Sequence, residues 1–265
     1  MFPVINFFGF PVATYGLGIL VAALLTFLLV GISAKKKNVD FICTFLIWLV
    51  GLFGALLGAK ILYIFVTYPV GVLVDMLCSG NFSFITSGGY VFYGGLFGGI
   101  IGAFIGGKLA MTKLSYVEDC IVPFIPLAHA IGRVGCFFAG CCYGIPYDGF
   151  LAVPYGKLIK GHAPDETIFP VQLLEAFLDV VICVVLLHIA KKKLKKFDLV
   201  FIYLALYGIM RFVTEFFRGD IHRGLFLGVS TSQWISLGIV VVCVARFLLD
   251  KWGFFEKNQK SEKNS

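Results

Sequence analysis

The chain has 265 residues, of which 59% are hydrophobic and only 14% are charged, whereas an average soluble domain carries about 25% charged residues. Such a chain cannot cover its surface with polar groups in water, which excludes an ordinary soluble protein and favours the bilayer as solvent. The formal charge of +7 does not indicate nucleic-acid binding. The basic residues occur in short clusters between apolar runs, as membrane anchors do.

Apolar runs long enough to span a bilayer recur along the whole chain. A spanning helix needs about 20 mostly apolar residues, and about seven runs meet that requirement. They cover residues 10–33, 41–68, 90–107, 117–138, 171–190, 199–217 and 229–249. The sequence therefore predicts an all-α, polytopic membrane helical bundle. We expect one domain over residues 1–255, followed by a polar, disordered cytoplasmic tail over residues 256–265.

The basic residues between the predicted spans indicate the orientation of the chain. An outer N-terminus places the lysines at 35–37, the cluster at 191–196 and the lysines of the tail on the inner side, as the positive-inside rule requires. The prediction is N-out and C-in. No basic residue precedes the first apolar run, so we expect a retained helix instead of a cleaved signal peptide. Residues 68–89 and 139–169 then lie outside, and the latter predicts a small exterior loop region.

Glycine punctuates the third predicted span, beginning with Gly94 and Gly95. Small residues allow two helices to approach closely, and such packing explains most of the pattern. The alternative is that the backbone at these two glycines approaches a lipid headgroup.

Charged residues at membrane depth are functional candidates, because each costs about 2.5–3.5 kcal/mol on insertion scales. These residues are Lys60, Asp119, Arg133, Glu175, Arg211 and Glu215. Asp179 is expected nearer a span end, where it reaches water. Tyr207, Arg211 and Glu215 recur every four residues and therefore share one helix face. This stripe is either a structural ion pair between helices or a phosphate-binding arginine whose guanidinium Glu215 holds in place.

The most unusual segment follows His129 and contains Arg133 between glycines, among them Gly135. Glycine allows the backbone to come close to a ligand. Two arginines from different helices, Arg133 and Arg211, would make a clamp for a phosphodiester, because each guanidinium can bind two oxygens at once.

Three cysteines, Cys136, Cys141 and Cys142, lie in the same segment. Metal binding or redox chemistry is one interpretation of the group. The group lacks a CxxC pair, however, and His129 is the only nearby imidazole. We therefore expect packing of small residues and no metal.

These motifs resemble the prolipoprotein diacylglyceryl transferases of bacterial plasma membranes, over nearly the whole chain. Residues 132–144, GRVGCFFAGCCYG, are similar to the family's G-R-x-G-N-F-x-N-G-E-x-x-G. Residues 207–218, YGIMRFVTEFFR, resemble its Y-G-x-x-R-F-x-x-E-x-x-R. Further support comes from Asp119, from YG at residues 15–16, from GYVFYGG at residues 89–95, and from PVQLLE at residues 170–175, which is similar to H-P-x-Q-L-Y-E.

The resemblance implies a multi-pass enzyme of the bacterial plasma (inner) membrane without a cofactor. Members of the family transfer the diacylglyceryl group of phosphatidylglycerol to the lipobox cysteine in the signal peptide of a prolipoprotein, releasing glycerol phosphate. The nucleophile then belongs to the substrate. The enzyme would bind the phosphate, help to deprotonate the thiol and stabilise the leaving phosphate. The family's arginines match Arg133 and Arg211, and its tyrosine matches Tyr207.

The chain departs from the family pattern at several positions, so the resemblance does not identify the general base that deprotonates the thiol. The family has His where this chain has Tyr93, Asn and Glu in place of Cys136 and Cys141, and His in place of Phe169. Tyrosine has an unperturbed pKa of about 10 and is a poorer base at neutral pH. The predicted catalytic residues are Tyr93, His129, Tyr207 and Arg211. The predicted phospholipid-binding residues are Arg133, Gly94, Gly95, Gly135, Gly144 and Glu215.

Three functions remain compatible with these departures. The chain is a transferase that uses His129 or the Tyr93 hydroxyl as base, a paralogue that transfers a lipid group to another acceptor, or a phospholipid-binding membrane protein without catalysis. A transporter would predict an internal repeat, and the glycine-rich third span has no counterpart in the second half.

Overall fold

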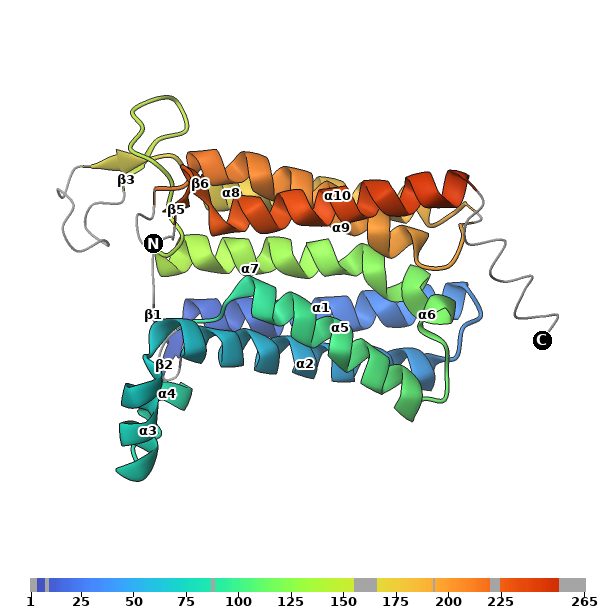
Figure 1. The fold of residues 1–265 in the computed structure, drawn as a ribbon, viewed down its shortest axis with the longest axis horizontal. Coiled ribbons are helices and arrows are strands. Elements are labelled where there is room, and N and C mark those ends of the chain that lie inside the picture. Colours follow the sequence, from blue (N-terminus) through green and yellow to red (C-terminus); the bar gives the residue numbers. More distant parts are fainter. Residues whose placement is uncertain are drawn as a thin grey trace. The chain divides into compact units, whose positions relative to one another are not determined.

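The computed structural model describes residues 4–7, 10–86, 89–154, 166–192, 194–219 and 225–252. Within these ranges, seven helical segments are long and apolar enough to cross a membrane, which confirms the predicted polytopic helical bundle (Figure 1). They are Thr14–Lys36, Phe41–Thr67, Phe92–Leu109, Leu114–Ala139, Val171–Ile189, Asp198–Phe217 and Thr231–Lys251. The orientation and the single domain stay predictions, and the predicted tail lies outside the described residues.

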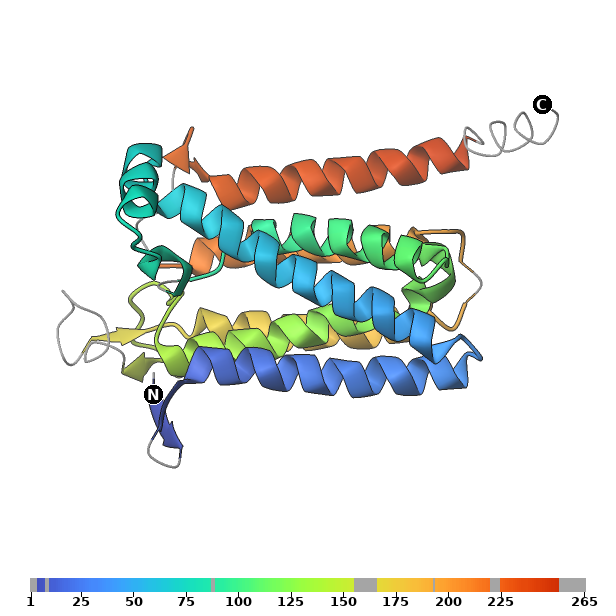
Figure 2. The same ribbon diagram turned by 90° about the horizontal axis from the view of Figure 1, so that it is seen from below.

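The chain divides into two compact units. The first unit comprises residues Met1–Thr26 and Val122–Ser265, and the second comprises Phe27–Ile121. Figure 2 shows the same ribbon turned by 90° about the horizontal axis.

The first unit combines helices with short antiparallel strand pairs. Its elements are β1 (Val4–Phe7), β2 (Phe10–Ala13), the first part of α1 (Thr14–Lys36), η1 (Val122–Phe124), α7 (Ile125–Ala139), β3 (Val153–Pro154), β4 (Thr167–Ile168), α8 (Val171–Ile189), α9 (Asp198–Thr214), η2 (Glu215–Phe217), β5 (Leu225–Phe226), β6 (Val229–Ser230) and α10 (Thr231–Lys251). Strand β1 pairs with β2, β3 with β4 and β5 with β6. Helix α7 packs against α8, α8 against α9, and α9 against α10.

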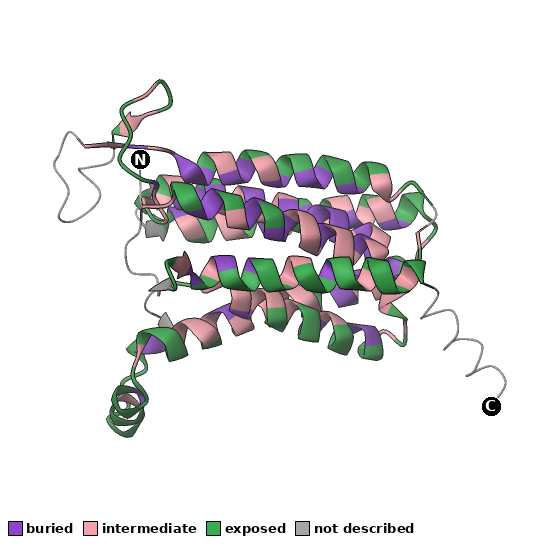
Figure 3. Cartoon of the chain, turned by 45° about the horizontal axis from the view of Figure 1, so that its top comes forward, coloured by how far each residue is buried: buried purple, intermediate pink, exposed green. Residues whose placement is uncertain are grey.

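Burial in the first unit separates inner from outer helix faces (Figure 3). Leu186 and Leu199 are fully buried, whereas Phe177 and Val184 are more than 60% exposed. Large exposed apolar side chains of this kind would be a liability in water but suit a surface that contacts lipid. The inner faces also bury charged side chains, which form the site described below.

The second unit is built around one close helix pair. Its elements are the rest of α1, α2 (Phe41–Thr67), α3 (Val70–Cys78), α4 (Ser83–Thr86), α5 (Phe92–Leu109) and α6 (Leu114–Ile121). Helices α2 and α5 pack through glycine. A Cβ added to Gly98 would collide with the carbonyl oxygen of Gly54 and lie 3.0 Å from the Cα of Gly58. Close packing through small residues therefore explains the glycine pattern of the third span.

The start of α2 is fixed by its N-cap residue. The backbone N–H of Cys43 donates to Oδ1 of Asp40 at 2.7 Å, which satisfies one of the free donors at the helix start. This hydrogen bond holds the pKa of the Asp40 carboxyl below its usual value.

Candidate functional site

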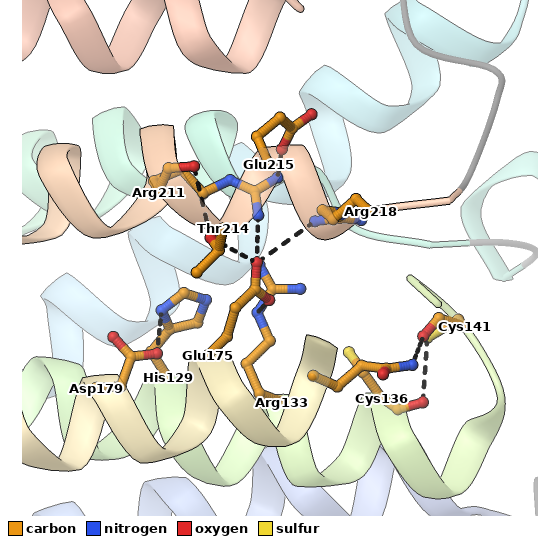
Figure 4. A network of polar contacts seen from close by, with 11 residues as sticks. His129, Arg133, Cys136, Cys141, Glu175, Asp179, Arg211, Thr214, Glu215 and Arg218 are labelled. Atoms are coloured by element: carbon orange, nitrogen blue, oxygen red, sulfur yellow. Dashed lines mark hydrogen bonds and ion pairs between the residues drawn. The ribbon is translucent and has the colours of Figure 1, made fainter. Parts of the chain in front are cut away.

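One buried carboxylate, that of Glu175 on α8, gathers charged side chains from three segments of the first unit (Figure 4). Its Oε2 lies 2.9 Å from Nε of Arg133 on α7. Its Oε1 lies 2.6 Å from Nη1 of Arg211 on α9 and 4.0 Å from Nη1 of Arg218. The hydroxyl of Thr214 donates to the same Oε1 at 3.2 Å. Glu175 therefore links α8 to both neighbouring helices.

A second carboxylate completes this group of charges. Oε2 of Glu215 lies 2.8 Å from Nη2 of Arg211, one helical turn away. We call Arg133, Glu175, Arg211, Glu215 and Arg218 the arginine–glutamate cluster. The cluster therefore contains three arginines and two glutamates. Their side chains are less than 10% exposed, so little solvent screens their charges. Buried arginines of this kind can bind a phosphate or carboxylate anion.

Local backbone contacts hold the two ends of the segment that carries Arg133. A Cβ added to Gly135 would lie 3.6 Å from the Cα of Gly18, so α7 and the start of α1 pack closely there. Helix α7 ends at Gly140, which adopts a left-handed conformation with a φ of 78°, as glycine does at many helix ends. Farther on, Gly144 forms an antiparallel bridge with Arg218. This bridge joins the loop after α7 to the end of η2.

A histidine–carboxylate pair lies beside the cluster on the same helices. Nδ1 of His129 on α7 lies 3.0 Å from Oδ2 of Asp179 on α8, and the Asp179 side chain is 0% exposed. The imidazole also contacts the ring of Tyr207, with 5.3 Å between the ring centroids. A carboxylate beside Nδ1 of a histidine can orient the ring for general base catalysis at Nε2.

Three thiols lie near the end of α7. The sulfur atoms of Cys136, Cys141 and Cys142 all lie within 4.8 Å of one another. Hydrogen bonds from Cys136 and Cys141, together with the charges of Arg133 and Arg218, hold the pKa of the Cys142 thiol well below its usual value. The side-chain nitrogen of Gln172 on α8 donates to the carbonyl oxygen of Cys141 at 2.8 Å.

The predicted site residues divide between the two units. The first unit contains those of α7, of the following loop and of α9–η2, namely His129, Arg133, Gly135, Gly144, Tyr207, Arg211 and Glu215. The structure brings Arg133, Arg211 and Glu215 into one cluster and places His129 against Tyr207. The functional roles predicted for these residues stay predictions.

The second unit contains the remaining predicted residues, Tyr93, Gly94 and Gly95, at the start of α5. A Cβ added to Gly94 would collide with the carbonyl oxygen of Gly58 and lie 2.6 Å from Cβ of Leu62. Gly94 therefore has a packing role in this unit. Its predicted lipid contact, and the predicted roles of Tyr93 and Gly95, stay predictions.

Three residues of the site were not predicted as site residues. Glu175 was recognised only as a charge at membrane depth, and Arg218 only as part of a motif. The expectation that Asp179 reaches water is wrong, because the residue is 0% exposed and pairs with His129. The spacing of the two carboxylates indicates that they belong to one site, because Glu175 and Asp179 are four residues apart and therefore share a helix face.

Comparison with known proteins agrees with these motifs. The model of the family described as "Prolipoprotein diacylglyceryl transferase" matches residues 3–249. The chain is similar to the phosphatidylglycerol–prolipoprotein diacylglyceryl transferase of Clostridium tetani, with 32% identity over 92% of this chain and 96% of the relative. It is also similar to the enzyme of the same name from Helicobacter pylori, with 32% identity over 80% of this chain and 76% of the relative.

Proposed function

The chain belongs to the prolipoprotein diacylglyceryl transferase family, and from this premise we propose that it transfers the diacylglyceryl group of phosphatidylglycerol to a prolipoprotein. It is a transferase of lipoprotein biosynthesis, as its relatives are by name. We further propose that the acceptor is the lipobox cysteine of the signal peptide and that the enzyme works in the bacterial inner membrane.

The arginine–glutamate cluster is the observation that carries this proposal. A phospholipid donor presents a phosphodiester anion, and the cluster places three arginines within one buried group. Glu175 contacts Arg133 through Nε, so the edge formed by the two terminal amino groups is available for a second, bidentate partner. Glu175 and Glu215 hold Arg211 from two sides, which fixes its guanidinium before the substrate arrives.

The same charges would act on the leaving group. In the transfer, the thiol sulfur forms a C–S bond with the glyceryl carbon, while the C–O bond to the phosphate breaks. Negative charge then builds up on the departing glycerol phosphate. Arginines that are fixed in a buried site stabilise such charge without reorganisation at the moment of reaction.

The thiol proton needs an acceptor, and we assign this role to His129. The nucleophile of the reaction is a thiolate, so the acceptor thiol has to lose its proton. Asp179 lies against Nδ1 of His129, and we assign Nε2 as the nitrogen that takes the proton. Tyr207 packs against the imidazole and helps to keep it in this orientation. The Tyr93 hydroxyl is the alternative base.

A reconstituted transfer assay tests the proposal. The purified chain is mixed in detergent with phosphatidylglycerol and a short lipobox peptide, and mass spectrometry measures the diacylglyceryl adduct on the peptide cysteine. Phosphatidylethanolamine replaces phosphatidylglycerol in a parallel reaction. Arg133→Ala is compared with Arg246→Ala, a matched control whose arginine pairs with Asp198 and Asp250 outside the cluster.

The proposal requires an adduct with phosphatidylglycerol that disappears in Arg133→Ala and persists in Arg246→Ala. An adduct that persists in Arg133→Ala overturns the role of the arginine. If the wild-type chain binds phosphatidylglycerol but forms no adduct, the chain is a lipid-binding protein and the proposed transferase activity is wrong.

A further inference from the structure

We propose that Cys136, Cys141 and Cys142 form a three-thiolate site for a soft, thiophilic d10 cation, Cu(I) or Zn(II). The three sulfur atoms lie within 4.8 Å of one another. In a site with Zn–S bonds of about 2.3 Å, the sulfur atoms are about 3.8 Å apart. Small side-chain rotations therefore suffice to bring the three sulfurs to bonding distance of one ion.

Packing of small residues, which the sequence favours for these cysteines, does not explain their placement. It accounts for Cys136, which is buried, but Cys141 is exposed and Cys142 is only partly buried. Packing in a core does not explain why the sulfur of an exposed cysteine lies beside two other sulfurs. A disulfide would use two of the sulfurs and leave the third, whereas a metal ion uses all three.

The backbone around the thiols is shaped to bring them together. Gly140 ends α7 in a left-handed conformation, and Cys142 adopts a φ of 56°, which side chains other than glycine rarely take. The backbone N–H of Cys141 donates to the carbonyl oxygen of Cys136 at 3.2 Å. Gln172 holds the carbonyl of Cys141 from α8. Supporting contacts of this kind orient the ligands of a metal site.

The donor set determines the class of ion. Thiolates select soft ions such as Cu(I) and Zn(II) over Mg²⁺ or Ca²⁺, which prefer oxygen. Within the described part of the chain, the group contains three sulfur ligands and no histidine or carboxylate. Three sulfurs complete a trigonal Cu(I) site, whereas Zn(II) would keep a fourth position for water. Arg133 and Arg218 offset part of the negative charge of the thiolates.

Metal titration of the reduced, detergent-solubilised chain tests this inference without using transferase activity. Zn(II) and Cu(I) are added separately under anaerobic conditions, in competition with a chromophoric chelator for each ion. We expect about one tightly bound equivalent of at least one ion per chain. The ion that binds more tightly in these two titrations is the ion that the site selects.

Variants assign the bound ion to the three cysteines. Cys136→Ser, Cys141→Ser and Cys142→Ser each remove one thiolate and should each weaken binding by more than the roughly 10- to 100-fold that loss of a supporting, non-ligating partner costs. Cys78→Ser is the matched control, since Cys78 is an exposed cysteine at the end of α3, and it should bind as the wild type does.

Thiol labelling of the wild-type chain provides a second measurement that needs no variant. The bound ion should protect Cys141 and Cys142 from iodoacetamide while Cys78 is labelled equally with and without the ion. The proposal is overturned if neither ion binds the wild type, if all three cluster variants bind unchanged, or if labelling of Cys141 and Cys142 is unaffected. A disulfide that survives reduction within the group would overturn it as well.

Discussion

Nη1 of Arg211 lies 2.6 Å from Oε1 of Glu175, and the two side chains come from neighbouring helices of one buried core. The same carboxylate contacts Arg133 through its other oxygen. A single side chain on α8 therefore pairs with arginines from α7 and α9 together. All three residues belong to segments long and apolar enough to cross a membrane, where such pairing lowers the cost of a charged side chain.

The first prediction is that Glu175→Ala destabilises the fold. Removal of one partner of a buried pair leaves uncompensated charge and typically costs about 3–5 kcal/mol. Thermal unfolding of the detergent-solubilised chain should show a clear drop in Tm relative to the wild type.

Lys195→Ala is the control for this loss. Nζ of Lys195 lies 2.8 Å from Oδ2 of Asp250, but the Lys195 side chain is 54% exposed, and exposed pairs contribute about 0–1 kcal/mol. Equal Tm values for Glu175→Ala and Lys195→Ala would contradict a central structural role for Glu175.

The fold could be predicted from the sequence because a run of about 20 apolar residues in a membrane protein almost always forms a spanning helix. The fourth predicted span, residues 117–138, lies within Leu114–Ala139, which is long and apolar enough to cross a membrane, but this segment is not one continuous α-helix. The chain forms α6, a short 3-10 turn at Val122–Phe124, and then α7. Pro123 and Pro126 explain the change, because proline lacks the N–H that a continuous α-helix requires.

The sequence predicts the candidate site only where the interacting residues are close together along the chain. The four-residue spacing of Arg211 and Glu215 places them on one face, and they form the expected pair. The central role of Glu175 depends on partners 36 and 42 positions away along the chain, which spacing alone does not reveal. Asp179 was misplaced for the same reason, since its partner His129 comes from another helix.

The second prediction is that Arg133→Lys and Arg211→Lys each lose transferase activity on the order of 10²-fold, the size of effect seen when one preorganised donor is removed. Lysine keeps the positive charge but cannot provide two parallel hydrogen bonds to one phosphate. The transfer assay measures kcat/KM for each variant, with Arg246→Lys as the control. Wild-type rates in both cluster variants would disprove the phosphate clamp.

The third prediction concerns the assignment of His129 as base. His129→Ala should lower the rate by about 10²- to 10⁴-fold, the usual contribution of general base catalysis. Asp179→Asn should lower kcat by a smaller factor and leave KM for phosphatidylglycerol unchanged, because the amide no longer orients the imidazole while the arginines stay in place. A structural role alone would lower Tm but leave kcat of the folded variant as in the wild type.

Tyr93→Phe separates the two candidate bases. The variant removes only the hydroxyl. If His129 is the base, Tyr93→Phe keeps the pH profile of the wild type. If the hydroxyl of Tyr93 takes the proton, this variant loses activity and His129→Ala retains it, and the assignment of His129 is then wrong.

The fourth prediction addresses the helix pair of the second unit. Gly98→Ala should destabilise the chain by about 1–3 kcal/mol, the usual cost of overpacking, because the new Cβ would collide with the carbonyl oxygen of Gly54. Gly238→Ala on α10 is the control, since a Cβ there meets nothing within 4 Å and alanine favours the helix by about 1 kcal/mol. Thermal unfolding should therefore give a lower Tm for Gly98→Ala and an equal or higher Tm for Gly238→Ala. A Tm for Gly98→Ala at the wild-type value would show that α2 and α5 can separate without cost, and that glycine is not what holds them together.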